Sequence, residues 1–242
     1  MHHTISRRSF VSTGAGVLLS SAAPPSFLFS DESAGPPQML DHLLLGCHDL
    51  DRGIDFVEKH TGVRAAFGGV HPGRGTRNAL LSLGEKHYLE IIAPDPQQPA
   101  AADHYGLQKL TEPRLVMWAA HPGDLNEFAT RLHAAGLPFE GPTPGSRKRP
   151  DGQLLQWKTL NLKDDHAGLL PFFIEWSADT PHPSATAPTG CHLATFELLT
   201  PDAGALSKIV KQIGLDVTIS KADRPQLRAV IKGGDQVWEV TS

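Results

Sequence analysis

Three acidic residues lie in short apolar segments of the sequence, at Glu90 in YLEII, Glu175 in FIEWS and Glu239 in VWEVT. Such segments are typical of buried strands, where an ionised carboxylate is costly unless a partner compensates its charge. Each acid is therefore a candidate metal ligand, a candidate general base, or an acid whose side chain reaches water. Their recurrence in similar segments indicates a repeated structural unit.

The elements around these acids repeat along the chain. An apolar strand at 39–47, an amphipathic helix at 49–62 and three further strands form the first unit, and the same order returns after residue 114. Both later helices place apolar residues at i, i+3, i+4 and i+7, which predicts one buried face on each. We therefore predict an α+β protein with two tandem βαβββ modules at 39–183 and a third βαβββ-like module at 188–242.

The first 36 residues differ in kind from the rest. Arg7 and Arg8 are followed by Phe10 and a small, apolar run at 13–23 that is too short to cross a bilayer. This pattern resembles a twin-arginine export signal, and the alternative is a disordered N-terminal tail. We expect residues 1–36 to be a signal peptide and linker without a stable membrane anchor, and the mature protein to act in the periplasm or outside the cell.

Composition and motif searches narrow the function classes. The 242 residues carry a net charge of −4, so binding to nucleic acid is not expected. Cys47 and Cys191 belong to no CxxC pattern, which excludes a zinc ribbon or finger, and we expect both thiols to be unpaired. No GxSxG, SxxK or HExxH motif is present, and the turn HPGRG at 71–75 fits no nucleotide-binding pattern.

Four segments resemble the glyoxalase-like domain family of the vicinal oxygen chelate superfamily, which also contains extradiol dioxygenases. They are LDHLLLGCHDLDRGIDF (40–56), GRGTRNALLSLGEKHYLEIIAPDP (73–96), RKRPDGQLLQWK (147–158) and LPFFIEWSADTPHP (170–183). The resemblance implies that the sheets of the first two modules curl into a half-open barrel around a cleft.

The resemblance also implies where chemistry takes place. In metal-dependent members the ligands come from the first and fourth strands of each module, which correspond here to His42, Glu90 and Glu175. Imidazole and carboxylates suit a divalent metal such as Zn, Mn, Ni or Fe. Such a metal would stabilise an enediolate while one of the two carboxylates, Glu90 or Glu175, shuttles the proton as catalytic base.

The later modules depart from this pattern. Met117 stands where His42 stands in the first module, and His121, which has the same strand parity, lies nearer the strand end. The module that contains Glu239 has no matching histidine, so we interpret Glu239 as structural.

Other residues are expected to border the cleft. Arg74 and Asn78 belong to the glycine-rich turn, and Arg149 belongs to a basic run in the loop at 141–153, where it can attract an anionic ligand. The usual role of a tryptophan on a barrel strand is in the core, but Trp118, beside Met117, is the best candidate for stacking on a ligand.

The leading hypothesis is an exported protein that binds a small, oxygen-rich, anionic molecule and, if it is an enzyme, acts as a metal-dependent lyase or isomerase. A non-catalytic binding protein is the alternative, which Met117 and Trp118 favour. Extradiol dioxygenase activity is a third and weaker hypothesis, because that chemistry normally uses two histidines and one glutamate, and the sequence does not identify the second histidine. The third module either packs on the first two or pairs with its copy in another chain, and we predict a homodimer.

Overall fold

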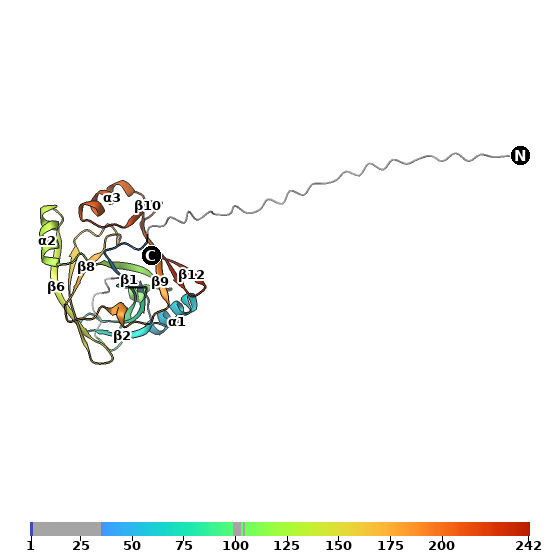
Figure 1. Ribbon diagram of the computed structural model, residues 1–242, viewed down its shortest axis with the longest axis horizontal. Helices are drawn as coiled ribbons and strands as arrows, with labels where there is room; N and C mark the ends of the chain where they lie inside the picture. The colour runs from blue at the N-terminus through green and yellow to red at the C-terminus, as the bar shows by residue number, and fades with distance from the viewer. Residues whose placement is uncertain (2–34, 99–102, 104) are drawn as a thin grey trace. The chain divides into compact units, whose positions relative to one another are not determined.

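The computed structural model describes residues 1, 35–98, 103 and 105–242, so the twin-arginine motif and apolar run of the expected export signal lie outside the described residues. The described part contains an eight-stranded sheet, a four-stranded sheet and three α-helices, which confirms the α+β class (Figure 1). In this part the longest helix has 12 residues, and no helix has the length and apolarity that crossing a membrane requires.

The first two modules follow the predicted order of elements. The first consists of β1 (Leu40–Gly46), α1 (Leu50–Thr61), β2 (Ala66–His71), β3 (Thr76–Ser82) and β4 (Tyr88–Pro94). The second consists of β5 (Arg114–Ala120), α2 (Leu125–Ala134), β6 (Phe139–Lys148), β7 (Leu154–Leu162) and β8 (Phe172–Trp176). Two short 3₁₀ helices, η1 (Leu107–Lys109) and η2 (Pro183–Ala185), follow the first and second modules.

Sequence signals account for the helix boundaries. Asp49 precedes α1 and Asp124 precedes α2, and each carboxylate accepts a hydrogen bond from backbone N–H groups of the first turn. Gly62 ends α1 in the left-handed region, with φ of 73°, where a glycine has no steric penalty.

Strand pairing joins the two modules into one curled sheet with the order β2-β3-β4-β1-β5-β8-β7-β6. In each module the first strand runs parallel to the fourth, and the antiparallel pair of β1 and β5 joins the two halves. The end strands β2 and β6 contact each other without forming a ladder, so the sheet closes into the expected half-open barrel.

The third module has the predicted order of elements but a different topology. It consists of β9 (Cys191–Thr200), α3 (Ala203–Gln212), β10 (Thr218–Lys221), β11 (Gln226–Gly233) and β12 (Gln236–Thr241). Its sheet order is β10-β9-β11-β12, so β9 pairs with the second and third strands of its module and not with the fourth. Glu239 lies exposed on the edge strand β12 and pairs with Arg228 at 2.8 Å, so its place is not equivalent to that of Glu90.

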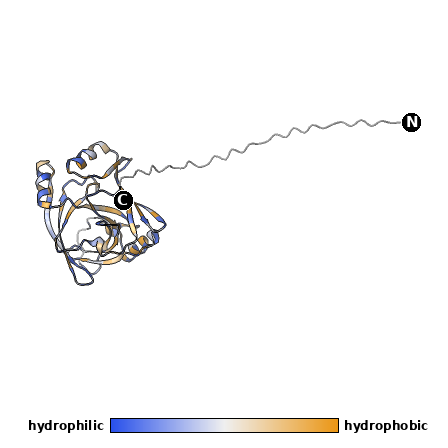
Figure 2. Cartoon of the chain, viewed as in Figure 1, coloured by the Kyte–Doolittle hydropathy of each residue, from blue (hydrophilic) through white to orange (hydrophobic). Residues whose placement is uncertain are grey.

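The third module covers the outer face of the barrel sheet. One hydrophobic core joins Leu43 and Leu45 of β1 with residues of β9, β11 and β12, and Trp118 of β5 meets Phe196 of β9 with ring centroids 5.1 Å apart. Figure 2 shows hydrophobic residues along the strands of both sheets. Of the two arrangements considered for the third module, the structure shows packing onto the first two, and both cysteines are buried free thiols as expected.

Candidate functional site

A cleft of about 1230 Å³ lies inside the curled sheet and is lined from both halves. Side chains alternate along a strand, so Tyr88, Glu90 and Ile92 of β4 face the cleft while Leu89 and Ile91 enter the core behind it. On the opposite wall, β8 presents its Phe172, Ile174 and Trp176 side chains by the same alternation.

The cleft holds a buried pair of ionisable groups, His42 and Glu90. The distance from His42 Nε2 to Glu90 Oε2 is 3.3 Å, and the two residues are only 2% and 7% exposed. Tyr88 stacks on the His42 ring at a centroid distance of 4.4 Å, which fixes the plane of the imidazole. The structure thus brings together two of the three residues that the resemblance implied as metal ligands.

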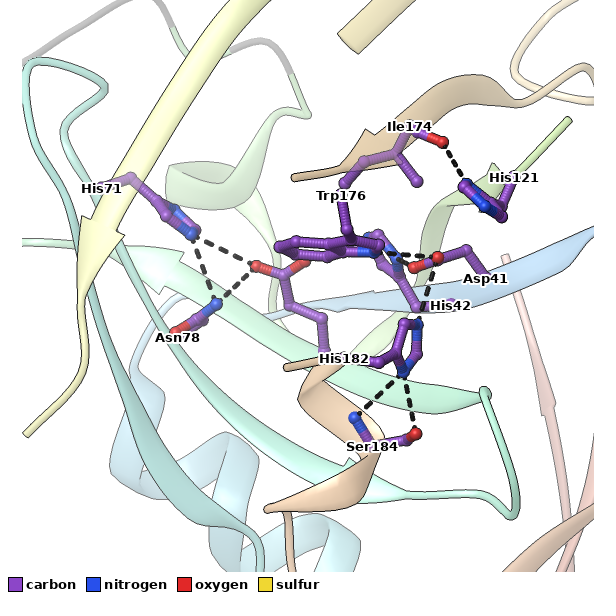
Figure 3. Close-up of polar contacts among 10 residues, drawn as sticks. Asp41, His42, His71, Asn78, His121, Ile174, Trp176, His182 and Ser184 are labelled. Carbon is purple, nitrogen blue, oxygen red and sulfur yellow. Dashed lines mark hydrogen bonds and ion pairs between the residues drawn. The ribbon is translucent and has the colours of Figure 1, made fainter. Parts of the chain in front are cut away.

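Asp41 anchors the other side of His42, as Figure 3 shows. The pairing of β1 with β5 shifts register between Leu40 and His42, and this bulge lets neighbouring residues meet instead of facing opposite sides of the sheet. Asp41 Oδ1 lies 2.6 Å from His42 Nδ1, while its Oδ2 accepts from Trp176 Nε1 at 3.0 Å and lies 3.2 Å from His182 Nε2.

These contacts determine the charges of the pair. Burial lowers the pKa of His42, but hydrogen bonds with Asp41 and Glu90 outweigh it and raise the pKa to about 9. Burial raises the pKa of Glu90, but the hydrogen bond from His42 and the nearby His71 lower it to about 2. The pKa of Asp41 also falls, because hydrogen bonds from His182 and His42 outweigh its burial. At neutral pH the site therefore holds an imidazolium between two carboxylates.

A second histidine, His71 of β2, completes the polar wall. Asn78 Nδ2 donates to Glu90 Oε1 at 2.7 Å and lies 3.3 Å from His71 Nε2, which in turn lies 3.5 Å from Glu90 Oε1. Burial lowers the pKa of His71, so its imidazole is neutral at neutral pH, and its Nδ1 lies 2.8 Å from Thr76 Oγ1. Asn78 is thus placed at the cleft, where the sequence predicted it.

The structure does not bring Glu175 to this site. Glu175 accepts from the backbone N–H of Leu125 at 2.8 Å and lies 3.4 Å from Lys158 Nζ, so it caps α2 on the outer face of the sheet. In β1, His42 pairs with Tyr88, two residues before Glu90; in β5, Ala119 pairs with Phe172, two residues before Ile174. Ile174 therefore occupies the place of Glu90, because a shift of one residue moves a side chain to the other face.

The remaining predicted residues are divided between the cleft and other places. Arg74 and Met117 line the cleft. Trp118 is fully buried on the outer face and donates to the Leu169 carbonyl at 2.8 Å, so it is a core residue and does not reach the cleft. Arg149 forms an ion pair with Asp151 at 3.2 Å beyond the end of β6 and does not line the cleft.

The donor set does not fit the metal centre that the resemblance implied. A catalytic zinc site uses three protein ligands, whereas the second half of the barrel offers Ala119 and Ile174 where the first offers His42 and Glu90. His121, considered as a substitute, bonds the Ile174 carbonyl at 2.8 Å through Nδ1. Within the described part of the chain, no group of three or more His, Cys, Asp or Glu side chains is arranged to hold a metal ion.

Sequence reasoning missed Asp41, His71, Trp176 and His182 as site residues, and it did not single out Arg147. His71 opens the HPGRG turn and His182 ends DTPHP, two segments already noted for other reasons. A histidine next to a carboxylate, as in Asp41-His42, was the available signal, but alternation along an ideal strand would separate the two side chains.

Comparison with known proteins agrees with the fold of this chain. The profile of the glyoxalase-like domain matches residues 40–214. A hypothetical protein from Staphylococcus aureus has the same fold, with a TM-score of 0.60, 17% identity, and coverage of 83% of this chain and 84% of that chain. No curated protein is significantly similar in sequence.

Methylmalonyl-CoA epimerases are also among the similar solved structures. A variant of the Streptomyces coelicolor enzyme in complex with 2-nitronate-propionyl-CoA has 24% identity and a TM-score of 0.43, covering 60% of this chain and 97% of that chain. The enzyme from Mycobacterium tuberculosis has 21% identity and a TM-score of 0.40, covering 62% and 91%. The profile match spans both modules of the barrel and enters the third module, so this chain belongs to the glyoxalase-like domain family.

Proposed function

We propose that the protein binds a small, oxygen-rich, anionic molecule in the barrel cleft, where His42 and Glu90 act on it as proton donor and acceptor. The observation that carries this proposal is a buried histidine and carboxylate, with His42 Nε2 3.3 Å from Glu90 Oε2, that both line a cleft large enough for a small molecule. Burial of this kind is costly for a purely structural pair, which supports a functional reason for it.

The pair needs a ligand to become reactive. With a pKa of about 2, Glu90 is a weak base in the free protein, because His42 donates to it. A ligand carbonyl that accepts from His42 Nε2 takes the place of Glu90 as acceptor. Glu90 then loses its nearest cation in a buried environment, its pKa rises, and it can remove a proton from the carbon next to that carbonyl. Return of the proton to the opposite face of that carbon inverts it, which is an isomerisation, and departure of a leaving group from the adjacent carbon gives lyase chemistry.

Proton exchange tests this proposal directly. Wild type is incubated in D₂O with 2-oxopropanoate, 2-oxobutanoate and 3-oxobutanoate, and deuterium uptake at carbon is followed by proton NMR. We expect uptake above the spontaneous rate for at least one of these acids with wild type and not with Glu90→Gln. Equal rates with wild type and Glu90→Gln would contradict the catalytic role of Glu90.

A binding protein without turnover is the second candidate. The apolar wall of Ile174, Trp176 and Met117 favours it, because it can hold a ligand but offers no second catalytic group. Ligand binding without deuterium uptake distinguishes this candidate from the enzyme.

A metal-dependent lyase or isomerase, or an extradiol-type dioxygenase, requires a divalent metal that the donor set does not favour. Elemental analysis of protein purified without chelator tests both activities. One equivalent of metal in wild type that is lost in His42→Ala would support a metal-dependent activity. It would contradict the conclusion that the donor set does not fit a metal centre.

Export and dimer formation are further proposals. A reporter fused to residues 1–36 should appear in the periplasm of a bacterium with twin-arginine transport, and replacing Arg7 and Arg8 with lysine should abolish this export.

The homodimer is tested by light scattering. A monomer at micromolar concentration would contradict the proposal of a homodimer.

A further inference from the structure

The barrel contains a buried guanidinium that no carboxylate neutralises directly. Arg147 of β6 is only 3% exposed and lines the cleft, and its Nη1 donates to the backbone carbonyl of Gly68 on β2. Among the ion pairs of the described residues, none includes Arg147. Burying an unpaired cation is costly, so an anion that joins it would gain a strong, charge-assisted interaction.

The two halves of the barrel meet at β2 and β6, and this contact leaves room for the Arg147 side chain. The ladder of β2 and β3 shifts register between Phe67 and Gly69, and the carbonyl of Gly68 turns toward Arg147. A Cβ at Gly69, where φ is +142°, would lie 2.6 Å from the Lys148 carbonyl and 3.2 Å from Arg147 Nη1. The absence of a side chain at Gly69 therefore leaves room for the β6 backbone and for the guanidinium.

The charges around Arg147 favour a monoanion. Burial lowers the pKa of Arg147. The charges that act on its guanidinium are those of Glu90 and Tyr88 of β4 and of Arg149 beyond the end of β6. Glu90 already accepts hydrogen bonds from Asn78 and His42, and its negative charge would oppose a dianion more than a single carboxylate.

Other acids that line the cleft have partners other than Arg147, and Glu140 among them lies 3.8 Å from Lys163 Nζ. Asp95 accepts from Gln98 at 2.9 Å, Asp103 from the Leu107 N–H at 2.7 Å, and Asp165 from the Gly168 N–H at 3.1 Å. None of them competes for the guanidinium.

We propose that Arg147 binds the carboxylate of a 2-oxo- or 2-hydroxycarboxylate, whose neighbouring oxygen accepts from His42. Arg147, His42 and Glu90 line the same cleft, and the carbonyl that Arg147 bonds belongs to β2, the strand that also carries His71. A planar guanidinium matches a carboxylate, and this assignment rests on the proposed function because it names the ligand class of the same site.

Binding measurements with matched variants test this assignment. The probes are 2-oxopropanoate, 2-hydroxypropanoate, the methyl esters of both, and inorganic phosphate, and binding is followed through NMR signals of the Arg147 Nε–H and the His71 imidazole. We expect both acids to bind wild type, with affinity at least about tenfold weaker in Arg147→Gln, reduced in Arg147→Lys, and unchanged in Lys148→Gln, which removes an exposed charge from the same strand. The esters should bind at least about tenfold more weakly than the acids.

The other possible results of these binding measurements would contradict different parts of the proposal. Acids and esters that bind equally well, with no loss in Arg147→Gln, would overturn the assignment of Arg147 and leave the proposed cleft function intact. No response of His71 or Arg147 to any probe in wild type would overturn both the assignment of Arg147 and the proposed cleft function. Binding of phosphate alone, dependent on Arg147, would overturn the carboxylate class. If Arg147→Gln does not fold, Arg147→Lys supplies the comparison, because it keeps the charge and loses the planar donor geometry.

Discussion

Replacing Asp41 with asparagine removes the charge that holds His42 protonated. Asp41 lies 2.6 Å from His42 Nδ1, and its hydrogen bond is the largest contribution that raises the pKa of His42 to about 9. Without that charge, burial of the imidazole dominates, and we expect the pKa of His42 to fall well below 9.

The free energy of unfolding should report this change through its pH dependence. Because the pKa of His42 is raised from 6.5 to about 9 on folding, its contribution to stability is complete below pH 6.5 and is lost as the pH rises through 9. The difference corresponds to about 3 kcal/mol. His71 and His87 have lowered pKa values, so their contributions are lost as the pH falls below 6.5 and do not produce a decline above it.

Urea unfolding at intervals between pH 6.5 and 9 measures the effect over the range set by His42. Wild type should lose about 3 kcal/mol across this range, whereas Asp41→Asn should start about 3 kcal/mol lower and lose less than about 1 kcal/mol. Asp151→Asn, which removes an exposed carboxylate paired with Arg149, is the control and should keep the wild-type slope. The same decline in wild type and Asp41→Asn, or no decline in wild type, would refute the reasoning.

Three further substitutions test how the surrounding structure is held. Glu175→Gln should lower the free energy of unfolding by about 1 kcal/mol through the weaker cap on α2, without changing carboxylate binding in an NMR titration. Trp118→Phe should cost about 1 to 3 kcal/mol, because the buried carbonyl of Leu169 loses its donor, and urea unfolding will show whether it does. Gly69→Ala should cost more than about 2 kcal/mol in the same assay, while Gly73→Ala, with no atom within 4 Å of its Cβ, should cost less.

The fold was largely predictable because its signals are local. Periodic apolar residues, Asp before each helix and Gly after α1 specify the order of elements, and the structure confirms that order in all three modules. The pairing of β9 with β10 and β11 was not predictable in this way, because strand order depends on contacts between distant residues.

The candidate site was only partly predictable. His42, Glu90 and Asn78 lie on strands of the first module and line the cleft, because the apolar pattern of the sequence locates those strands. Asp41 and His71 required knowledge of a bulge in β1 and of the contact between the His71 and Glu90 side chains across β3, neither of which has a sequence pattern of its own.

The three acids that recur in similar apolar segments of the sequence show how strand topology determines the role of a residue. Glu90, Glu175 and Glu239 have similar neighbours along the chain, but one faces the cleft, one caps α2 and one lies on an exposed edge strand. In the second module the shift of one residue turns Glu175 outward and leaves Ile174 facing His42 and Glu90 across the cleft. The charged groups of the proposed site, His42, Glu90 and Arg147, therefore come from the first half and from β6, so we expect a ligand to bind asymmetrically, with its charged end toward β2, β4 and β6.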